Sequence, residues 1–559
     1  MDSAVSDAVT DAPWLASYPA GVPATVDPDA FPSLHALLLA ACRRHAERPA
    51  FDFLGAVMTY EEWERTSAAF AAFLIETLRR RPGDRVAIML PNMLAYPVAF
   101  LGTLRAGLTV VGVNPLYTPR EMQAQLADCG ATTIVIMENF AHKLELVIAN
   151  TAIDHVVVVR LGDLVPLLKR WAFNFANTHL RHAVPPWRFE RFTMLQDACA
   201  HVAAASLPDA DERPKAPALL QYTGGTTGVA KGAILSHRNM LANAMQCASW
   251  IGPHVMPGVE RVLTPLPLYH IFSLTANLLT FASLGGTNVL VPDPRDIRRL
   301  VATMRRTRVT AMSGVNTLFN ALVNAPDFAK LDFSELKLAI GGGAAVQSAV
   351  AERWLAITGV PLAEGYGLTE ASPVVCINPV QQPNLGTVGL PVSSTAVSIR
   401  DDQGRAVAGG EMGEVWVRGP QVMQGYLGRP DETARTLTPD GWLKTGDIGV
   451  IDPGGFVRLL DRKKDMIIVS GFKVFPNEVE DVVVQHPGVL EAAVIGVPDE
   501  RTGQAVKLFV VRRDPALDEA DLRSYCHDNL TGYKIPKYIE FRDMLPKSNI
   551  GKILRKELH

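Results

Sequence analysis

Short apolar runs alternate with helix-like stretches between about residue 55 and residue 160, and this alternation restricts the fold more than any other pattern. The apolar runs cover residues 85–90, 110–113, 133–136 and 156–159, and helical patterns cover 61–78 and 122–128. Continuous apolar runs are typical of strands buried on both faces, and strands that alternate with helices indicate βαβ units. We therefore predict an α/β fold with parallel sheets covered by helices.

The alternation resumes after residue 290 and later changes character. Helices are predicted at 295–306, 316–324 and 346–357, with strands at 309–312 and 336–340. From about 386 to 460, short strands between Gly, Pro and Asp turns predict a β-rich subdomain. A basic run at 461–465 marks a boundary, and beyond it helices (478–486, 518–529) and strands (492–497, 506–512) predict a small α+β domain.

The composition is that of a globular protein with more than one domain. The chain has 559 residues, of which 48% are hydrophobic and 20% charged. Its net charge of −3 implies no bulk attraction to nucleic acid, so any anion site must be local. The N-terminus lacks the basic region of a secretory signal, and the six scattered cysteines favour reduced thiols. We therefore expect a cytoplasmic protein.

Residues 222–233 (Tyr-Thr-Gly-Gly-Thr-Thr-Gly-Val-Ala-Lys-Gly-Ala) carry the strongest chemical signal. They follow an apolar run at 217–221. Glycines let successive backbone N–H groups surround an anion, threonine hydroxyls add donors, and Lys231 adds a positive charge. No Gly-Lys-Ser/Thr opens a helix, so this is not a P-loop. The pattern predicts a triphosphate-binding loop, with a glycine-rich surface turn as the alternative.

Five segments in this order resemble the motifs of the adenylate-forming (AMP-forming) synthetase superfamily. They are 222–233, 364–370 (Glu-Gly-Tyr-Gly-Leu-Thr-Glu), 441–447 (Gly-Trp-Leu-Lys-Thr-Gly-Asp), 461–471 (Asp-Arg-Lys-Lys-Asp-Met-Ile-Ile-Val-Ser-Gly) and 546–555 (Pro-Lys-Ser-Asn-Ile-Gly-Lys-Ile-Leu-Arg). The resemblance extends over about residues 30–558 and favours bacterial long-chain fatty acyl-CoA synthetases. The chain departs from their pattern at Gly224, where serine is commoner, and at Lys473, where asparagine is expected.

The resemblance implies a division of the chain into four parts. Residues 1–30 would be an N-terminal extension, and residues 31–460 an adenylation domain that binds ATP and the acid. Residues 461–465 would be a hinge, and residues 466–559 a small mobile α+β lid. The glycines near 341–345 would pass beside the adenine, although a tight strand-to-helix turn explains them equally well.

The resemblance also implies which residues bind the nucleotide and CoA. Tyr366 offers a ring face to adenine, and Asp447 offers two acceptors to the ribose hydroxyls. Ser470 and Gly471 would line the pantetheine tunnel in a second domain orientation. The full set of implied binding residues is Thr223, Gly224, Gly225, Thr227, Gly228, Lys231, Gly342, Gly343, Tyr366, Gly367, Thr369, Asp447, Arg462, Lys464, Ser470 and Gly471.

Four residues are implied to take part in catalysis. Lys552 would be the adenylation lysine, and Glu370 with Thr226 would hold Mg²⁺, which usually binds through one or two carboxylates plus phosphates. His270 would border the acid, although a lone histidine in an apolar stretch is more often a core residue. Trp250 and Val315 are candidates for the acyl pocket wall.

These residues imply an ATP-dependent ligase that converts a long-chain fatty acid to acyl-AMP and then to acyl-CoA. Its cofactors would be ATP, Mg²⁺ and CoA, with free CoA as acceptor because no carrier domain follows residue 559. The alternatives are the same chemistry on a medium-chain or aryl acid, and a non-catalytic nucleotide- or lipid-binding relative. The joint presence of Lys231, Glu370, Asp447 and Lys552 argues against the last.

The segment 165–192 stands apart because aromatic residues are interspersed with cations. The aromatic residues are Trp171, Phe173, Phe175, Trp187 and Phe189, and the cations are Lys169, Arg170, Arg181, Arg188 and Arg191. This composition is typical of an interfacial membrane helix, and a surface connection packed on the domain is the alternative. Peripheral contact with the inner face of the plasma membrane is therefore a hypothesis. A homodimer is implied by resemblance alone.

Overall fold

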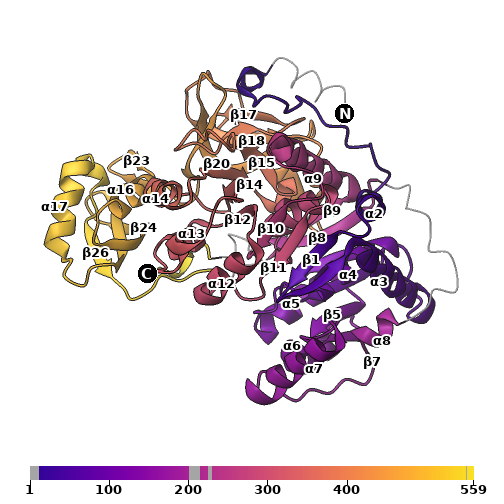
Figure 1. Cartoon of the computed structure of the whole chain (residues 1–559). Coiled ribbons are helices and arrows are strands. Elements are labelled where there is room, and N and C mark those ends of the chain that lie inside the picture. Colours follow the sequence, from indigo (N-terminus) through magenta and orange to yellow (C-terminus); the bar gives the residue numbers. More distant parts are fainter. Residues whose placement is uncertain (1–11, 201–213, 224–229, 549–550, 559) are drawn as a thin grey trace.

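The computed structural model describes residues 12–200, 214–223, 230–548 and 551–558. Its first large sheet has eight strands in the order β19-β9-β8-β4-β3-β5-β6-β7 (Figure 1). Strands β8 to β7 along this order are parallel, whereas β9 and β19 are antiparallel to their neighbours. The strands are β3 (Arg85–Met89), β4 (Thr109–Gly112), β5 (Thr133–Met137), β6 (His155–Val159), β7 (Phe192–Met194), β8 (Pro217–Thr223), β9 (Lys231–Ser236) and β19 (Gly425–Tyr426).

The second large sheet has nine strands in the order β16-β15-β14-β13-β12-β10-β11-β1-β2. It is parallel from β14 to β1 and ends in antiparallel strands on both sides. The parallel βαβ layers predicted from the sequence are thus confirmed. The strands are β1 (Pro49–Phe53), β2 (Ala56–Thr59), β10 (Arg261–Thr264), β11 (Thr287–Leu290), β12 (Ala311–Gly314), β13 (Leu338–Gly341), β14 (Leu362–Gly367), β15 (Val374–Ile377) and β16 (Leu390–Pro391).

Helices cover both sheets, and α9 (His237–Ile251) contacts strands of each. Reciprocal side-chain caps begin α3, α5 and α9. The helix predicted at 61–78 is α3 followed by a π-helical turn, Phe73–Thr77.

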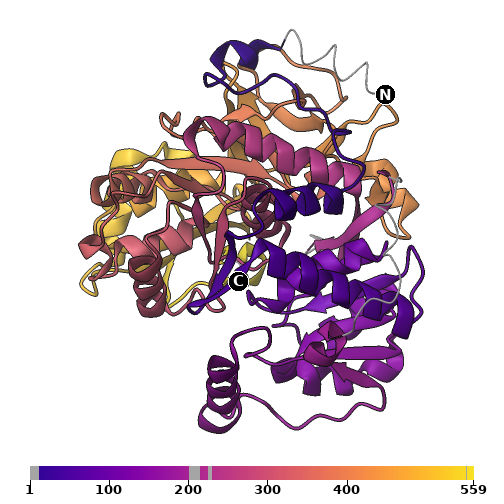
Figure 2. The ribbon, with the colours of Figure 1, turned by 45° about the vertical axis from the view of Figure 1, so that its right-hand side comes forward.

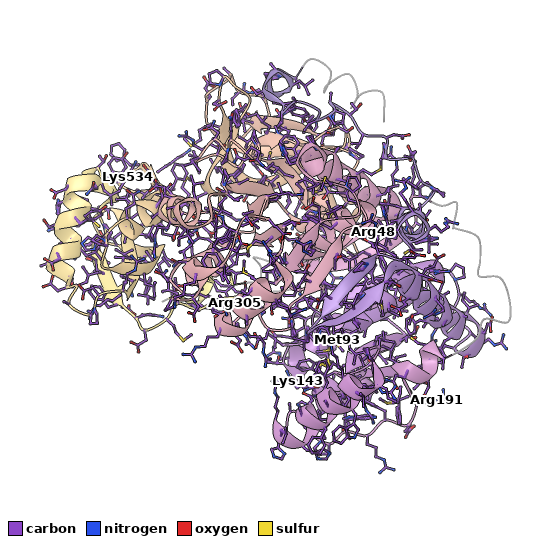
Figure 3. All side chains as sticks on the ribbon, in the orientation of Figure 1. Arg48, Met93, Lys143, Arg191, Arg305 and Lys534 are labelled. Carbon is purple, nitrogen blue, oxygen red and sulfur yellow. The ribbon has the colours of Figure 1, made fainter. Side chains whose placement is uncertain are left out.

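Fully buried Met93 lies among the side chains that fill the interior (Figure 3). The other helices are α2 (Leu34–Arg44), α3 (Tyr60–Ala72), α4 (Ala95–Arg105), α5 (Pro119–Cys129), α6 (Glu138–Glu145), α7 (Leu167–Phe175), α8 (Leu195–Cys199), α10 (Ile271–Ser273), α11 (Thr280–Ser283), α12 (Ile297–Thr307), α13 (Asn316–Val323), α14 (Ser348–Thr358) and α15 (Pro430–Thr436).

A four-stranded antiparallel sheet, in the order β17-β18-β20-β21, forms the predicted β-rich subdomain. Its strands are β17 (Ala396–Arg400), β18 (Gly413–Arg418), β20 (Leu443–Ile451) and β21 (Val457–Arg462). The last strand, β21, ends inside the basic run 461–465, so the chain leaves the larger part of the molecule there.

The remaining residues form a separate lobe, yellow in Figures 1 and 2, around one five-stranded sheet. The long hairpin of β24 and β25 carries most of it, and β26 pairs with β25 in parallel. Helices α16 and α17 pack with the sheet around an apolar cluster confined to this lobe. The elements are β22 (Ile467–Val469), β23 (Phe472–Val474), α16 (Pro476–Val484), β24 (Val489–Asp499), β25 (Gly503–Arg512), α17 (Glu519–Asn529) and β26 (Tyr538–Phe541).

Across the described residues, no helix combines the length and the apolar character that crossing a bilayer requires. The stretch 262–292, which has no Asp, Glu, Lys or Arg, contains β10 and β11 and the short helices between them. Trp250, a candidate for the acyl pocket wall, lies in the core, where its ring meets that of Tyr18 edge-on at 5.2 Å.

We predict that Gly102 sets the close approach of α3 and α4. A Cβ atom at this position would lie 2.8 Å from Phe70 Cδ1 and 2.9 Å from the Ser67 carbonyl oxygen. Overpacking of this kind costs about 1–3 kcal/mol, more than alanine gains in helix propensity. Gly102→Ala should therefore lower the apparent melting temperature. The matched control is Gly252→Ala, where a Cβ meets nothing within 4 Å. Equal melting of the two variants would contradict the close contact.

Candidate active site

Asp447 and Arg462 form the centre of the candidate site, because they face each other across β20 and β21. Arg462 Nε lies 3.0 Å from Asp447 Oδ1, and the Tyr366 hydroxyl donates to Asp447 Oδ2 at 2.5 Å. Tyr366 comes from β14 of the nine-stranded sheet, so the site lies where that sheet meets the β-rich subdomain. Burial and the Asp447 carboxylate hold the pKa of Tyr366 well above its ordinary value, so the phenol stays a donor.

Tyr426 lies between Glu370 and Lys231 and contacts both. The Tyr426 hydroxyl donates to Glu370 Oε1 at 2.6 Å, and Lys231 Nζ lies 5.5 Å from the centre of the Tyr426 ring. Lys231 also forms an ion pair with Glu432 of α15. Because burial and the nearby Glu370 raise the pKa of Tyr426, the tyrosine is a neutral hydrogen-bond donor.

Tyr426 and Glu432 lie outside the motifs from which the site residues were predicted. The register of β9 with β19 places Tyr426 opposite Ala233, close to Lys231. A strand of two residues, paired with another strand about 190 positions away, leaves no periodicity in the sequence. Glu432 lies in the first turn of α15, where an acidic residue is favoured by the helix dipole alone.

The predicted phosphate loop is described only at its two ends. Thr223 ends β8 and pairs with Lys231, which begins β9, so the two residues hold the ends of the loop side by side. The predictions for Gly224, Gly225, Thr226, Thr227 and Gly228 lie outside the described residues.

Gly343 and Gly367, two of the predicted glycines, occupy positions that a side chain would strain. Gly343 has φ +77°, a conformation that strongly favours glycine. A Cβ on Gly367 would lie 2.2 Å from the Pro373 carbonyl oxygen, so no other residue fits there without a shift. Gly342 follows β13 beside Phe272, and Thr369 begins a short 3₁₀ turn that includes Glu370.

Lys552 reaches this cluster from the C-terminal lobe. Ser548 N donates to the Lys552 carbonyl at 2.7 Å and Lys552 N donates to Ser548 Oγ at 3.1 Å, which closes a tight loop. The loop contacts the larger part of the molecule, because Thr317 Oγ1 donates to the Gly551 carbonyl at 3.0 Å. A Cβ on Gly551 would lie 3.2 Å from Val315, so this candidate pocket residue borders the lysine loop.

The electrostatics of Lys552 and His270 reflect their proximity. Desolvation, and then the charge of Arg462, lowers the pKa of Lys552 to about 8, although the residue as a whole is exposed. Burial, and then the charge of Lys552, lowers the pKa of His270 to about 4. His270 Nδ1 accepts from Phe272 N at 3.3 Å. The histidine is therefore neutral at pH 7 and its Nε2 atom carries the proton.

The structure separates Ser470 and Gly471 from this cluster, as far as the described residues show. They form the exposed turn between β22 and β23, and Ser470 N donates to the Thr502 carbonyl at 2.9 Å within the same lobe. Lys464 follows β21 and lies 3.8 Å from Asp465, with about half of its side chain exposed. In this domain orientation Lys552, and not the 470–471 turn, is at the site.

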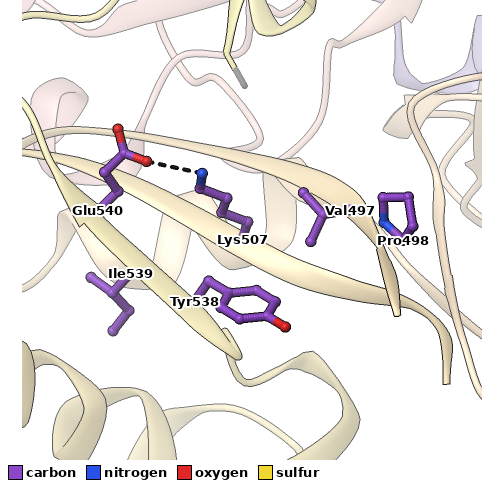
Figure 4. A pocket seen from close by; sticks show the side chains of 6 residues that line it. All are labelled: Val497, Pro498, Lys507, Tyr538, Ile539 and Glu540. Atoms are coloured by element: carbon purple, nitrogen blue, oxygen red, sulfur yellow. Dashed lines mark ion pairs between the residues drawn. The ribbon is translucent and has the colours of Figure 1, made fainter. Parts of the chain in front are cut away.

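An open cavity of about 460 Å³ lies elsewhere, on the C-terminal lobe (Figure 4). It is lined by Val497, Pro498, Lys507, Tyr538, Ile539 and Glu540, and Lys507 Nζ pairs with Glu540 at 2.9 Å. None of the residues predicted for catalysis or binding lines this cavity. Its two charged groups neutralise each other, so we do not assign it to the reaction.

Comparison with known proteins identifies a family of related enzymes. The AMP-binding enzyme family model matches residues 38–427, and the model of the AMP-binding enzyme C-terminal domain matches residues 478–552. A long-chain-fatty-acid–CoA ligase of Salmonella typhimurium is 53% identical, and the match covers 98% of this chain and 97% of the relative. A long-chain-fatty-acid–CoA ligase of Haemophilus influenzae is 46% identical, and the match likewise covers 98% of this chain and 97% of the relative.

A solved structure of similar fold is an anthranilate CoA ligase in complex with anthranoyl-AMP. It superposes with a TM-score of 0.85 at 25% identity and covers 95% of this chain and 98% of its own. Taken with the family models, these matches show that the chain belongs to the AMP-binding enzyme family and has the adenylate-forming enzyme fold.

Proposed function

We propose that this chain activates a long-chain fatty acid with ATP and transfers the acyl group to coenzyme A. The observation that carries the proposal is the meeting of Lys552 and Arg462 at one site with Asp447, Tyr366 and neutral His270. The identity of 53% to a long-chain-fatty-acid–CoA ligase supports the choice of substrate.

In the first step both reactants are anions and repel each other, so the site must supply positive charge. A carboxylate oxygen of the acid attacks the α-phosphorus of ATP, the bond from that phosphorus to the bridging oxygen breaks, and pyrophosphate leaves. Lys552 and Lys231 offset the negative charge that gathers on the phosphate oxygens. Asp447 has lone pairs beyond the two contacts described above, which suits the ribose hydroxyls. Tyr366, fixed by its bond to Asp447, presents its ring to the adenine.

Mg²⁺ fits the carboxylate of Glu370, which accepts a hydrogen bond from a neutral phenol. The ion would supply further neutralisation of the phosphates, and Glu370 with Thr226 would hold it. No group of three or more His, Cys, Asp or Glu side chains suited to a metal occurs among the described residues. One carboxylate with nucleotide phosphates is the usual Mg²⁺ arrangement.

The second step needs a thiol at the acyl carbon and a different arrangement of the small lobe. The thiol sulfur of CoA bonds to the acyl carbon, AMP leaves with the former carboxylate oxygen, and the thiol proton is released. We propose that residues 466–559 rotate about the hinge at 461–465, where Lys464 is the pivot. Lys552 would then withdraw and Ser470 and Gly471 would face the pantetheine.

A test of the proposed function is turnover with a panel of acids from acetate to oleate, plus a coumarate. Each buried CH₂ contributes about 0.8 kcal/mol, so AMP and acyl-CoA formation should rise with chain length. Removal of Mg²⁺ with EDTA should abolish AMP formation. A peak on a medium-chain or aryl acid would move the substrate and keep the mechanism. Binding of ATP without turnover of any acid would favour a non-catalytic relative.

We predict that Lys552 acts as a cation in the first step. Lys552→Ala should slow acyl-AMP formation by about 10²–10³-fold and leave conversion of supplied acyl-AMP to acyl-CoA intact. Because a pKa of about 8 means that Lys552 loses its charge as pH rises through 8, the first step should decline above that pH. His270 stays neutral throughout this range. Lys552→Arg should flatten the decline in single-turnover measurements, and an unchanged decline would assign it to another group.

We also propose that the exposed face of α7 contacts an anionic lipid surface. Leu168 is 86% exposed and Trp171 68%, and the Trp171 ring stacks on Phe175 at 5.2 Å. No residue of α7 is buried. Figure 2 shows this helix projecting from the end of the N-terminal part, the end at which Figure 3 places Arg191. The segment 165–192 holds five lysines and arginines and a single carboxylate, so its charge suits anionic headgroups.

Part of the segment packs on the protein, which restricts the proposed surface. Phe173 meets Phe53 edge-on at 6.4 Å, and Phe189 is buried. Lys169 bonds to the Gly55 carbonyl, and Arg170 bonds to Gln196 at 3.0 Å. The packing holds α7 in place and leaves Leu167, Leu168, Trp171 and Phe175 outward.

Vesicle co-sedimentation checks the surface. The chain should sediment with anionic vesicles more than with zwitterionic ones, and Trp171→Ser with Phe175→Ser should abolish the difference. Met544→Ser, which changes a 75% exposed apolar residue on the C-terminal lobe, is the control. Equal sedimentation of all variants would refute the lipid surface. Concentration-dependent dimerisation lost in the double variant would instead assign this face to a second copy.

A further inference from the structure

Arg555 lies three residues after Lys552 and is surrounded by carboxylates. Its Nη2 and Nε atoms bond to the two oxygens of Glu480 at 2.8 Å and 3.1 Å, and its Nη1 lies 3.1 Å from Asp461 Oδ1. Asp465 is 3.9 Å away, and Asn477 Oδ1 accepts a further bond. The carboxylates raise the pKa of Arg555 against the effect of its burial, so its charge is permanent.

The partners of Arg555 belong to different parts of the molecule. Glu480 lies on α16 of the C-terminal lobe and also accepts from Val494 N at 2.7 Å in the same lobe. Asp461 lies on β21 of the β-rich subdomain, before the proposed pivot, and its side chain is 1% exposed. Asp461 Oδ2 accepts from Asn477 N at 2.9 Å. The pair of Arg555 with Asp461 therefore joins the two sides of the boundary.

Arg555 directly follows the paired residues at the base of the loop that carries Lys552. Leu554 N donates to the Pro546 carbonyl at 2.9 Å, and Lys547 pairs with Ile553 as a β-bridge. The same strand that presents Asp461 to Arg555 presents Arg462 to Asp447. Neighbouring residues of β21 thus hold the lysine loop and a binding residue of the site.

We propose that Arg555 is a positioning residue for the first half-reaction: its contact with Asp461 holds the C-terminal lobe in the orientation that places Lys552 at the site. The contact of Arg555 with Glu480 stays formed when the lobe rotates, because both residues belong to the lobe. The contact of Arg555 with Asp461 must break when the lobe rotates for the second half-reaction. This inference rests on the proposed function and adds to it the residue that maintains the orientation seen here.

The experiment measures the two half-reactions separately in the full-length chain. Arg555→Ala should slow single-turnover acyl-AMP formation by the order of a hundredfold, since a displaced catalytic group costs about that much. Conversion of supplied acyl-AMP and CoA to acyl-CoA should be unchanged or faster. Arg555→Lys should restore part of the first step, because lysine keeps the charge without the fork of donors. Asp461→Asn should add nothing to the effect of Arg555→Ala on the first step, because both substitutions disrupt the contact between Arg555 and Asp461.

The matched control is Lys547→Ala, which removes a cation of the same loop whose ion pair with Glu491 lies wholly within the C-terminal lobe. It should slow neither half-reaction. Equal loss of both half-reactions in Arg555→Ala, or in a well-folded Arg555→Lys variant, would overturn the inference and leave the ligase function standing. Absence of acyl-AMP formation by the unaltered chain, with every acid, would overturn the proposed function and this inference with it.

Discussion

The pairing of β20 with β21 is the constraint on which the rest of the site depends. Adjacent residues of a strand point to opposite faces. Arg462 therefore lies beside Asp447 and Tyr366, while Asp461 turns toward the C-terminal lobe and binds Arg555 and Asn477. One end of one strand thus organises the nucleotide side of the site and the domain boundary together. A slip of one residue in this register would exchange the two faces and disconnect both.

The charges at the site are arranged for an anion that arrives from outside. Lys552 and Arg462 repel each other, which contributes to the low pKa of Lys552, and Asp447 offsets that repulsion only in part. Neutral His270 beside them adds no positive charge at pH 7. A cluster of this kind gains most from a ligand that brings negative charge, and both a carboxylate and a phosphate do so. The electrostatics therefore favour the anionic reactants of adenylation independently of the family resemblance.

The parallel strands could be predicted from the sequence because burial on both faces makes them continuous apolar runs, as in β5 and β6. The place of Lys552 followed from the resemblance of its flanking residues to a motif. Tyr426 and Glu432 could not be predicted, since their role depends on the pairing of β9 with a two-residue strand far along the chain. The partners of Arg555 could not be predicted from the sequence either, because Asp461 and Glu480 are 94 and 75 positions away from it in the chain.

The division of the apolar core explains how the C-terminal lobe can be held and still move. Its apolar clusters contain only residues of the lobe, and those of the larger part contain only residues before the boundary, within the described chain. The hydrogen bonds that join the two link Thr317 with Gly551, Asn320 with Leu490, Ser348 with Asp481, and Arg555 and Asn477 with Asp461. Each such bond contributes about 0.5–1.5 kcal/mol net and is replaced by water on separation. Rotation therefore exposes little apolar surface, and a few directional contacts suffice to select the orientation in which Lys552 meets the site.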